Sequence, residues 1–116
     1  MKKLRNHLIG VDQGDASLFS DFEDGGKMWT GTGPRERRKK AKFSDTFSSP
    51  PVVQVGLSLS DIDTDHNIRA EVTAEKITTS GFELVFRTWG DSRVARVRMN
   101  WLAIGELYHE DDWEVD

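Results

Sequence analysis

Alternation of apolar and polar side chains at every second position, repeated in four segments, is the feature that most constrains the fold of this chain. The segments are residues 52–60, 68–75, 82–89 and 94–103. A period of two places alternate side chains on opposite faces of a β-strand, so each segment predicts a strand with one apolar face. Polar turns separate the segments, and none of them has a helical period. The pattern therefore predicts an all-β fold, an antiparallel sandwich or barrel.

The second and third segments predict a hairpin that closes through a turn before Phe82. With Thr78 opposite Phe82, the apolar sides of both strands fall on one face, and a slip of one residue would destroy this match. Arg69 then lies opposite Asp91 and diagonal to Trp89 on the polar face. This register places the three side chains together at one end of the sheet.

The first 34 residues are less regular than the rest of the chain. Residues 9–12 predict a short strand, and the glycines, serines and aspartates after it predict loops. Four apolar residues are expected to anchor this stretch to a core: Phe19, Phe22, Met28 and Trp29. The aromatic residues expected within the core itself are Trp29, Phe82, Phe86 and Trp101.

Residues 35–42 contain six basic residues and one acidic residue, and Pro50 and Pro51 follow shortly after them. Such a run suits a solvated edge strand, in which lysines block edge-to-edge aggregation. Two other roles fit the same charges. The run could hold phosphates or an anionic polysaccharide, or it could face acidic residues of a neighbouring chain.

Length and composition limit the class of protein. The 116 residues, 13.2 kDa in mass, predict one domain over residues 1–106 and an acidic tail over residues 107–116. No apolar run approaches the ~18 residues of a membrane-spanning helix. The net charge of −4 gives no general reason to expect nucleic-acid binding. No secretory signal follows the basic start, so the expected location stays open between the cytoplasm and an exported particle.

Motifs for catalysis or metal binding are weak. The chain has no cysteine, no nucleophile elbow and no placed histidine, so we expect no enzyme activity and no catalytic residue. Residues 61–67 carry an aspartate at every second place, as a calcium loop does. His66 replaces the glycine of an EF-hand loop, however, and Val72 replaces its bidentate glutamate. We therefore expect no metal ion and no cofactor.

An ordered series of short motifs resembles the H-type lectin domain. The motifs are Pro-Pro-Val-Val at residues 50–53, Asn-Ile-Arg at 67–69, Ser-Gly-Phe at 80–82, Thr-Trp at 88–89 and Asn-Trp-Leu-Ala-Ile at 100–104. The resemblance covers most of the chain, from about Val11 to Ile104. The family includes snail agglutinins and the C-terminal domain of slime-mould discoidins. The resemblance implies a six-stranded antiparallel β-sandwich.

The resemblance also implies a function and a site. Family members typically form homotrimers, sometimes stacked into hexamers, and bind galactose-type sugars, notably N-acetylgalactosamine, at the seams between subunits. The arginine of the Asn-x-Arg motif falls on Arg69, and the tryptophan of the Thr-Trp motif falls on Trp89. The family's next residue is a histidine, where this chain has Gly90, and the loop at 30–34 is several residues shorter and lacks a carboxylate. The predicted carbohydrate site comprises Arg69, Trp89, Gly90 and Asp91.

Two functions are open on these grounds. The first is a multivalent lectin-like module, because a guanidinium donates to paired hydroxyls and an indole covers the C–H face of a sugar ring. The second is an assembly domain, for example of a bacterial or phage-like particle, that keeps the trimer-forming fold without a sugar site. Arg69 and Trp89 favour the first function. Gly90 and the shortened loop favour the second.

Overall fold

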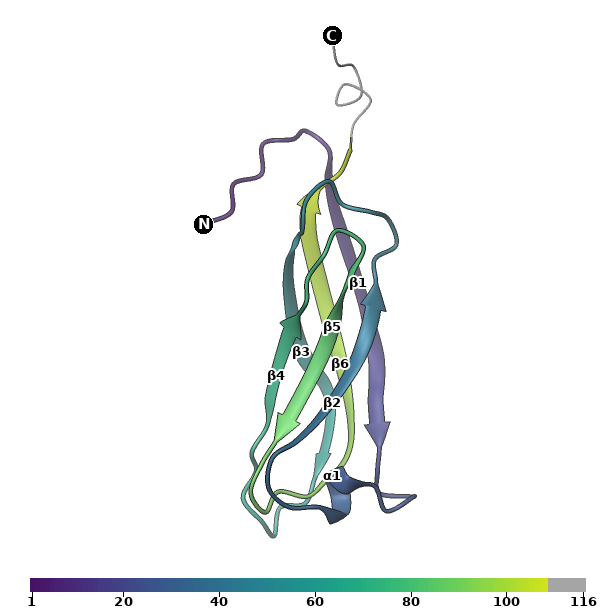
Figure 1. Ribbon diagram of the computed structural model, residues 1–116, viewed down its shortest axis with the longest axis vertical. Coiled ribbons are helices and arrows are strands. Elements are labelled where there is room, and N and C mark those ends of the chain that lie inside the picture. Colours follow the sequence, from purple (N-terminus) through teal and green to yellow (C-terminus); the bar gives the residue numbers. More distant parts are fainter. Residues whose placement is uncertain (109–116) are drawn as a thin grey trace.

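Six antiparallel strands form two three-stranded sheets packed face to face in the computed structural model, which describes residues 1–108 (Figure 1). The elements are β1 (Ile9–Ser20), α1 (Lys27–Thr30), β2 (Arg35–Lys42), β3 (Val52–Ile62), β4 (Glu71–Glu75), β5 (Gly81–Thr88) and β6 (Val94–Glu106). The strand order is β1-β6-β3 in one sheet and β2-β5-β4 in the other. The expected six-stranded antiparallel sandwich is confirmed. Among residues 1–108, no helix has the length and apolar character that a membrane crossing requires.

The strands run along the long axis of the molecule, so its two ends are built by different loops (Figure 1). Helix α1, the β3–β4 loop and the β5–β6 loop lie at one end, called here the α1 end. The β4–β5 turn, the amino terminus and the end of β6 lie at the opposite end. The loops that carry the predicted site residues therefore meet at the α1 end.

The central strands β5 and β6 supply most of the core between the sheets. Their inward side chains, each at most 9% exposed, are Phe82, Leu84, Phe86, Val97, Met99, Trp101 and Ala103. A central strand has a neighbour on both sides, so its inward face is shielded more fully than that of an edge strand. The inward faces expected for these two strands are confirmed, and β2 is an edge strand as the basic run predicts.

Strand β1 is much longer than the expected strand at residues 9–12. It pairs with β6 from Ile9 opposite Glu106 to Ser20 opposite Arg96. Gly14, whose residue type favours a turn, lies within this strand opposite Trp101. A Cβ at Gly14 would come within 2.8 Å of the Trp101 indole, so the glycine makes room for that ring. The expectation of loops up to residue 34 is therefore wrong over most of β1.

The β4–β5 hairpin has the expected faces but a different register. Val72 pairs with Phe86, two residues away from the partner that the expected register requires. The turn is longer than expected because Lys76 has a φ of 52° and Thr78 Oγ1 accepts hydrogen bonds from the Ser80 and Gly81 N–H groups. A shift of two residues keeps every side chain on its face, since the strand period is two.

Several apolar side chains depart from their expected positions, among them Ile68, which is 59% exposed. A bulge in β3 places Leu59 opposite Arg98, on the outer face of its sheet. Trp29 is only partly buried and packs against Phe22, with ring centroids 5.2 Å apart, while Phe22 itself is 60% exposed. Trp29 and Phe22 thus cover the α1 end and are not part of the core.

The predicted boundary between domain and tail falls near the end of β6. Strand β6 ends at Glu106, and the Leu107 N–H donates to the Leu8 carbonyl at 3.0 Å. Leu107 also packs against the core. Most of the predicted tail, residues 109–116, lies outside the described residues.

Candidate functional site

The predicted site residue Arg69 lies just before β4, where hydrogen bonds hold its backbone in place. Its N–H donates to Ser92 Oγ at 3.0 Å, and its carbonyl accepts from Thr88 Oγ1 at 2.6 Å. Thr88 and Ser92 are both buried, and Ser92 Oγ also donates to the Asn67 carbonyl. These bonds join the loop before β4 to the start of the β5–β6 loop, so the Arg69 backbone is fixed independently of its side chain.

The Arg69 side chain forms an ion pair with Asp91. Arg69 Nη1 donates to Asp91 Oδ1 at 2.6 Å, and the guanidinium lowers the pKa of the Asp91 carboxyl below its usual value. Both side chains are partly exposed, so part of the guanidinium and part of the carboxylate reach the surface. The pair is a fixed set of hydrogen-bond donors and acceptors at the surface.

Gly90 lies against this ion pair and has a conformation suited to glycine. Its φ is 69°, and a Cβ there would come within 3.0 Å of Arg69 Nη1. The Gly90 carbonyl accepts from the Gly33 N–H at 2.9 Å and from Arg35 Nη2 at 3.2 Å. A side chain at this position would require Arg69 to move, so Gly90 helps to set the position of the Arg69 guanidinium.

Trp89 is 42% exposed and faces a cavity beside the ion pair. The cavity has a volume of about 330 Å³ and is lined by Pro34, Arg35, Glu36, Glu71, Arg87, Thr88 and Trp89. Arg69 does not line this cavity. The structure therefore brings Arg69, Gly90 and Asp91 into contact, and places Trp89 next to them on a separate hollow. Sequence reasoning missed Glu36, Glu71 and Arg87, which only the pairing of β2, β5 and β4 brings into one row.

The basic run of β2 is divided between the two faces of the strand. Arg35 is buried, and its guanidinium donates to the carbonyls of Gly33 and Met28 in the β1–β2 connection as well as to Gly90. Arg37 pairs with Asp21 at 2.9 Å. These inward arginines fix the α1 end to the sheet and are therefore structural.

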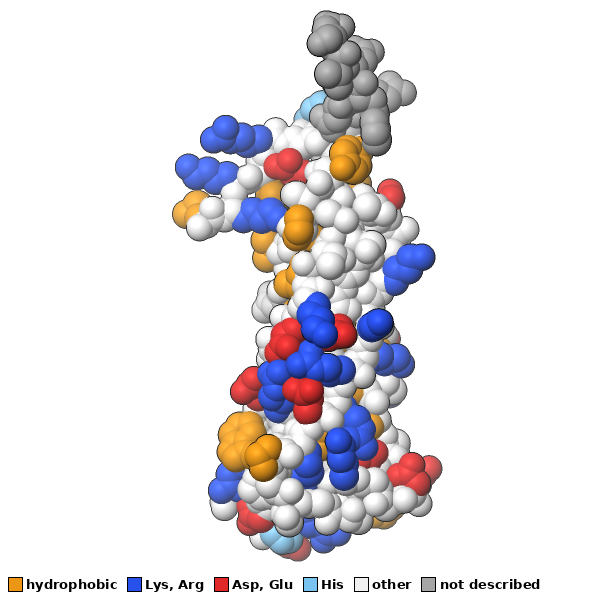
Figure 2. Space-filling view, viewed as in Figure 1, with side chains coloured by type: hydrophobic (Ala, Val, Ile, Leu, Met, Phe, Trp, Pro, Cys, Tyr) orange, Lys and Arg blue, Asp and Glu red, His pale blue; other side chains and the backbone are white. Residues whose placement is uncertain are grey.

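The outward side of β2 contributes to an ionic cluster on the β2-β5-β4 sheet. The cluster comprises Glu36, Arg38, Glu71, Glu75, Glu83 and Arg87, and Figure 2 shows acidic and basic side chains side by side on this face. Arg38 pairs with Glu36, Glu75 and Glu83 at 2.8–2.9 Å. Arg87 pairs with Glu36, Glu71 and Glu75 at 2.7–3.1 Å.

The ionic cluster changes the acidity of its carboxylates. Hydrogen bonds from Arg38 and Arg87 lower the pKa of Glu36. Hydrogen bonds from Arg87 and Arg38 lower the pKa of Glu75 in the same way. Both glutamates are therefore ionised at neutral pH. Every carboxylate of the cluster has an arginine partner, but four glutamates against two arginines leave the cluster with a net negative charge.

The loop that resembles a calcium site uses its carboxylates for contacts within the protein. Asp63 accepts from the Asp65 N–H at 2.9 Å and lies 3.7 Å from Arg93 Nη1, and Asp61 pairs with Arg96 at 3.3 Å. Within residues 1–108, no three His, Asp or Glu side chains form a group that could hold a metal ion. That calcium is not required remains a prediction.

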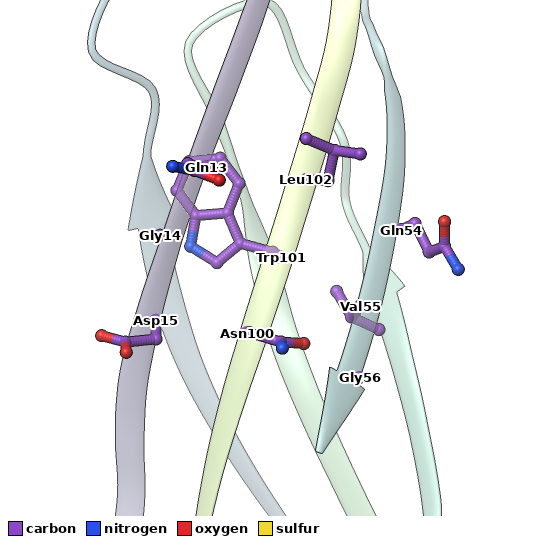
Figure 3. A pocket seen from close by; sticks show the side chains of 9 residues that line it. All are labelled: Gln13, Gly14, Asp15, Gln54, Val55, Gly56, Asn100, Trp101 and Leu102. Carbon is purple, nitrogen blue, oxygen red and sulfur yellow. The ribbon is translucent and has the colours of Figure 1, made fainter. Parts of the chain in front are cut away.

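A second hollow lies over the β1-β6-β3 sheet, a region that sequence reasoning did not assign as a site (Figure 3). It is shallow, has a volume of about 620 Å³, and follows the strands rather than a loop. Gln13 and Asp15 come from β1, Asn100 and Leu102 from β6, and Gln54 from β3. Its amide groups can both donate and accept hydrogen bonds.

Comparison with known proteins identifies the family. The H-type lectin domain model matches residues 38–104, more than half of the chain. The "ATP synthase subunits region ORF 7" protein of Fuscovulum blasticum is 54% identical over 108 residues, 93% of this chain and 94% of that protein. Discoidin-2 of Dictyostelium discoideum is 38% identical over 95 residues, 81% of this chain and 33% of that protein.

A solved structure agrees with these matches. Recombinant discoidin II of Dictyostelium discoideum is similar with a TM-score of 0.74 and 31% identity, over 86% of this chain and 38% of that chain. This chain thus spans between a third and two fifths of the discoidins that it matches. From the family model, the sequence relatives and the shared sandwich together, the chain belongs to the H-type lectin domain family.

Proposed function

We propose that this protein is a non-catalytic carbohydrate-binding module that acts as a homo-oligomer on galactose-type glycans. The observation that carries this proposal is an exposed Trp89 next to a guanidinium whose backbone is fixed by two buried hydroxyls. An indole face covers the C–H face of a sugar ring, and the free N–H groups of Arg69 donate to neighbouring hydroxyls. Asp91, held by Arg69, accepts a hydrogen bond from a hydroxyl of the same sugar.

The preferred sugar is expected to differ from N-acetylgalactosamine, or to bind weakly. Gly90 offers no side chain for a polar contact, and the loop at 30–34 carries no carboxylate. The hollow next to Trp89 offers Glu36 and Glu71 in their place, but Arg87 already pairs with both of them. Fewer free polar groups reduce the number of hydrogen bonds that a single sugar can form.

Self-association is the second part of the proposal, with a homotrimer as the expected form. The outer face of the β1-β6-β3 sheet carries Val11, Val52 and Leu102, which are 67%, 51% and 37% exposed. Val11 and Val52 flank Ile104 in one row of that face. Val94 does not belong to this surface, because it is fully buried. A contiguous exposed apolar patch of this kind marks an interaction site, and several weak sugar sites presented together bind more tightly than one.

Two variants test the sugar site. After a glycan array identifies a ligand for the purified protein, Arg69→Ala and Trp89→Ala are each expected to weaken its binding about tenfold or more by calorimetry, because each removes one to two hydrogen bonds or the stacking face. Arg5→Ala and Phe22→Ala remove an exposed arginine and an exposed aromatic side chain outside the site, and are expected to bind as wild type does. Equal binding by wild type and both site variants would contradict the proposed site.

A second candidate function is an assembly domain that keeps the fold without binding sugar. The observation that favours it is the Arg69–Asp91 ion pair, which satisfies both charges without a ligand. This function predicts no hit on the glycan array, while light scattering still detects an oligomer. A glycan that binds wild type and loses affinity in Trp89→Ala would exclude it.

A further inference from the structure

Three lysines gather at the end of the β2-β5-β4 sheet opposite the α1 end. Lys40 and Lys42 lie on the outer face of β2, opposite Glu83 and Gly81 of β5. Lys76 lies in the β4–β5 turn, where its φ of 52° gives the backbone a sharp change of direction. The three side chains line one cleft of about 510 Å³, called here the lysine cleft.

The cleft also offers neutral hydrogen-bonding groups. Thr78 and Ser80 of the turn line it, with their hydroxyl oxygens 3.3 Å apart. Gly81, opposite Lys42, has no side chain to fill the space between the turn and β2, and a Cβ there would come within 2.4 Å of the Ala41 carbonyl oxygen. The glycine therefore lets the backbones of β5 and β2 approach closely next to the lysines.

The positive charge of the lysine cleft is not neutralised by the part of the chain that the structure describes. Glu83 is the one carboxylate among residues 1–108 that lines the cleft, and it pairs with Arg38 at 2.9 Å. Lys76 lies 3.8 Å from that carboxylate. Lys40 and Lys42 have no hydrogen-bond or ion-pair partner within residues 1–108. The cleft thus differs from the neighbouring ionic cluster, where every carboxylate meets an arginine.

We propose that the lysine cleft binds the sulfate and carboxylate groups of an acidic polysaccharide. Ammonium groups pair with such anions as mobile point charges, and the exposed Ser80 hydroxyl adds a donor. The Thr78 hydroxyl is not available in this way, because it already donates to the Gly81 carbonyl at 3.0 Å. A long nucleic acid fits less well, because Glu36, Glu71 and Glu75 lie further along the same face and repel phosphates that follow the strands. The cleft lies about 25 Å from Trp89 along β5, at roughly 3.3 Å per residue, so this site is independent of the proposed galactose-type site.

The test uses a heparin-derived hexasaccharide as the probe, at physiological salt. Lys40→Gln/Lys42→Gln is expected to weaken its binding about tenfold or more. Lys3→Gln/Lys27→Gln removes two lysine charges from exposed positions outside the cleft and outside the proposed self-association face, and is expected to change binding less than about twofold. The melting temperatures of both double variants should match that of wild type, since none of the substituted lysine side chains has a hydrogen-bond or ion-pair partner to lose within residues 1–108.

Two outcomes would overturn the proposal. Equal losses in the two double variants would show that binding follows net charge alone, and unchanged binding by Lys40→Gln/Lys42→Gln would show that the probe binds elsewhere. Binding of the neutral sugar found on the array is expected to be unchanged in Lys40→Gln/Lys42→Gln. Failure of the lysine cleft is therefore distinguishable from failure of the Arg69–Trp89 site.

Discussion

The outer faces of the two sheets expose different kinds of side chain to water. On the β2-β5-β4 sheet, arginine and glutamate side chains pair with one another in the ionic cluster. The β1-β6-β3 sheet also carries charges, including the Arg96–Asp61 ion pair, but the part of its outer face around Ile104 holds exposed Val11, Val52 and Leu102 beside uncharged amides. On the first face, the charged side chains of the ionic cluster find their partners within one chain. The second leaves apolar surface uncovered, which suits a face that binds another copy of the chain.

The difference arises from residues at equivalent places in equivalent strands. Both central strands, β5 and β6, bury their inward face, and β5 also buries Val85 on its other face. The outward positions of β5 include Glu83, which pairs with Arg38 of β2, and Arg87, which pairs with glutamates of both neighbouring strands. Those of β6 include Leu102, which lies between Gln13 and Gln54. The same strand geometry therefore gives a surface of paired charges or a partly apolar surface, depending on which residues the neighbouring strands supply.

The largest expected effect comes from placing a charge on the apolar face. Leu102→Asp is expected to convert the oligomer to single chains at micromolar concentration, because an uncompensated carboxylate would be buried at the contact. Light scattering should give a mass close to three chains for wild type and close to 13.2 kDa for the variant. Thr64→Asp, in an exposed loop, is the control and should leave the mass unchanged. A wild-type protein that is already monomeric would contradict the role given to this face.

A smaller effect is expected from removing an arginine of the ionic cluster. Arg87→Gln breaks three ion pairs and is expected to lower the melting temperature by a few degrees at pH 7, since partly exposed pairs stabilise weakly even in a network. Arg98→Gln is the control, because it removes an arginine from the outer face of the other sheet. It is introduced together with Leu102→Asp, so that a change in self-association does not affect the comparison, and it is expected to change the melting temperature of that monomeric variant very little.

Low pH should remove the stabilisation that the ionic cluster gives to the wild-type protein. The folded-state pKa values of Glu36 and Glu75 are lowered, so their contribution is present above the unfolded pKa of about 4.3 and is lost as pH falls through the lowered folded values. The difference in melting temperature between wild type and Arg87→Gln should therefore shrink below about pH 4. A difference that stays constant down to pH 3 would contradict the ionic origin of the effect.

The smallest expected effect is that of metal removal. We expect the loop at residues 61–67 to need no metal ion, because Asp61 and Asp63 pair with Arg96 and Arg93. EDTA is expected to shift the melting temperature by less than about 1 °C, against the roughly 4–8 °C that a loss of 1 kcal/mol produces in a domain of 60–100 residues. A fall of several degrees that calcium reverses would show that the loop is a metal site.

The candidate site could be foreseen only in part. The Asn-Ile-Arg and Thr-Trp motifs pointed to Arg69 and Trp89, and the structure places both at the α1 end. The hollow beside Trp89 could not be foreseen, because Glu36 and Glu71 reach it from two other strands. The structural role of Arg35 could not be predicted either, since it donates to backbone carbonyls, and every residue type has a backbone carbonyl.

The sequence by itself determined the all-β class, the inward faces of β5 and β6 and the edge position of β2, because strand period and charge are local properties of the chain. Tertiary structure decided the length of β1, where Gly14 makes room for Trp101, and the register of the β4–β5 hairpin, where Thr78 sets the turn. It also decided which charges of residues 35–42 are inward and structural and which remain free at the surface. Each of these depends on contacts between residues far apart in the chain, and no local pattern records which partner a side chain will meet.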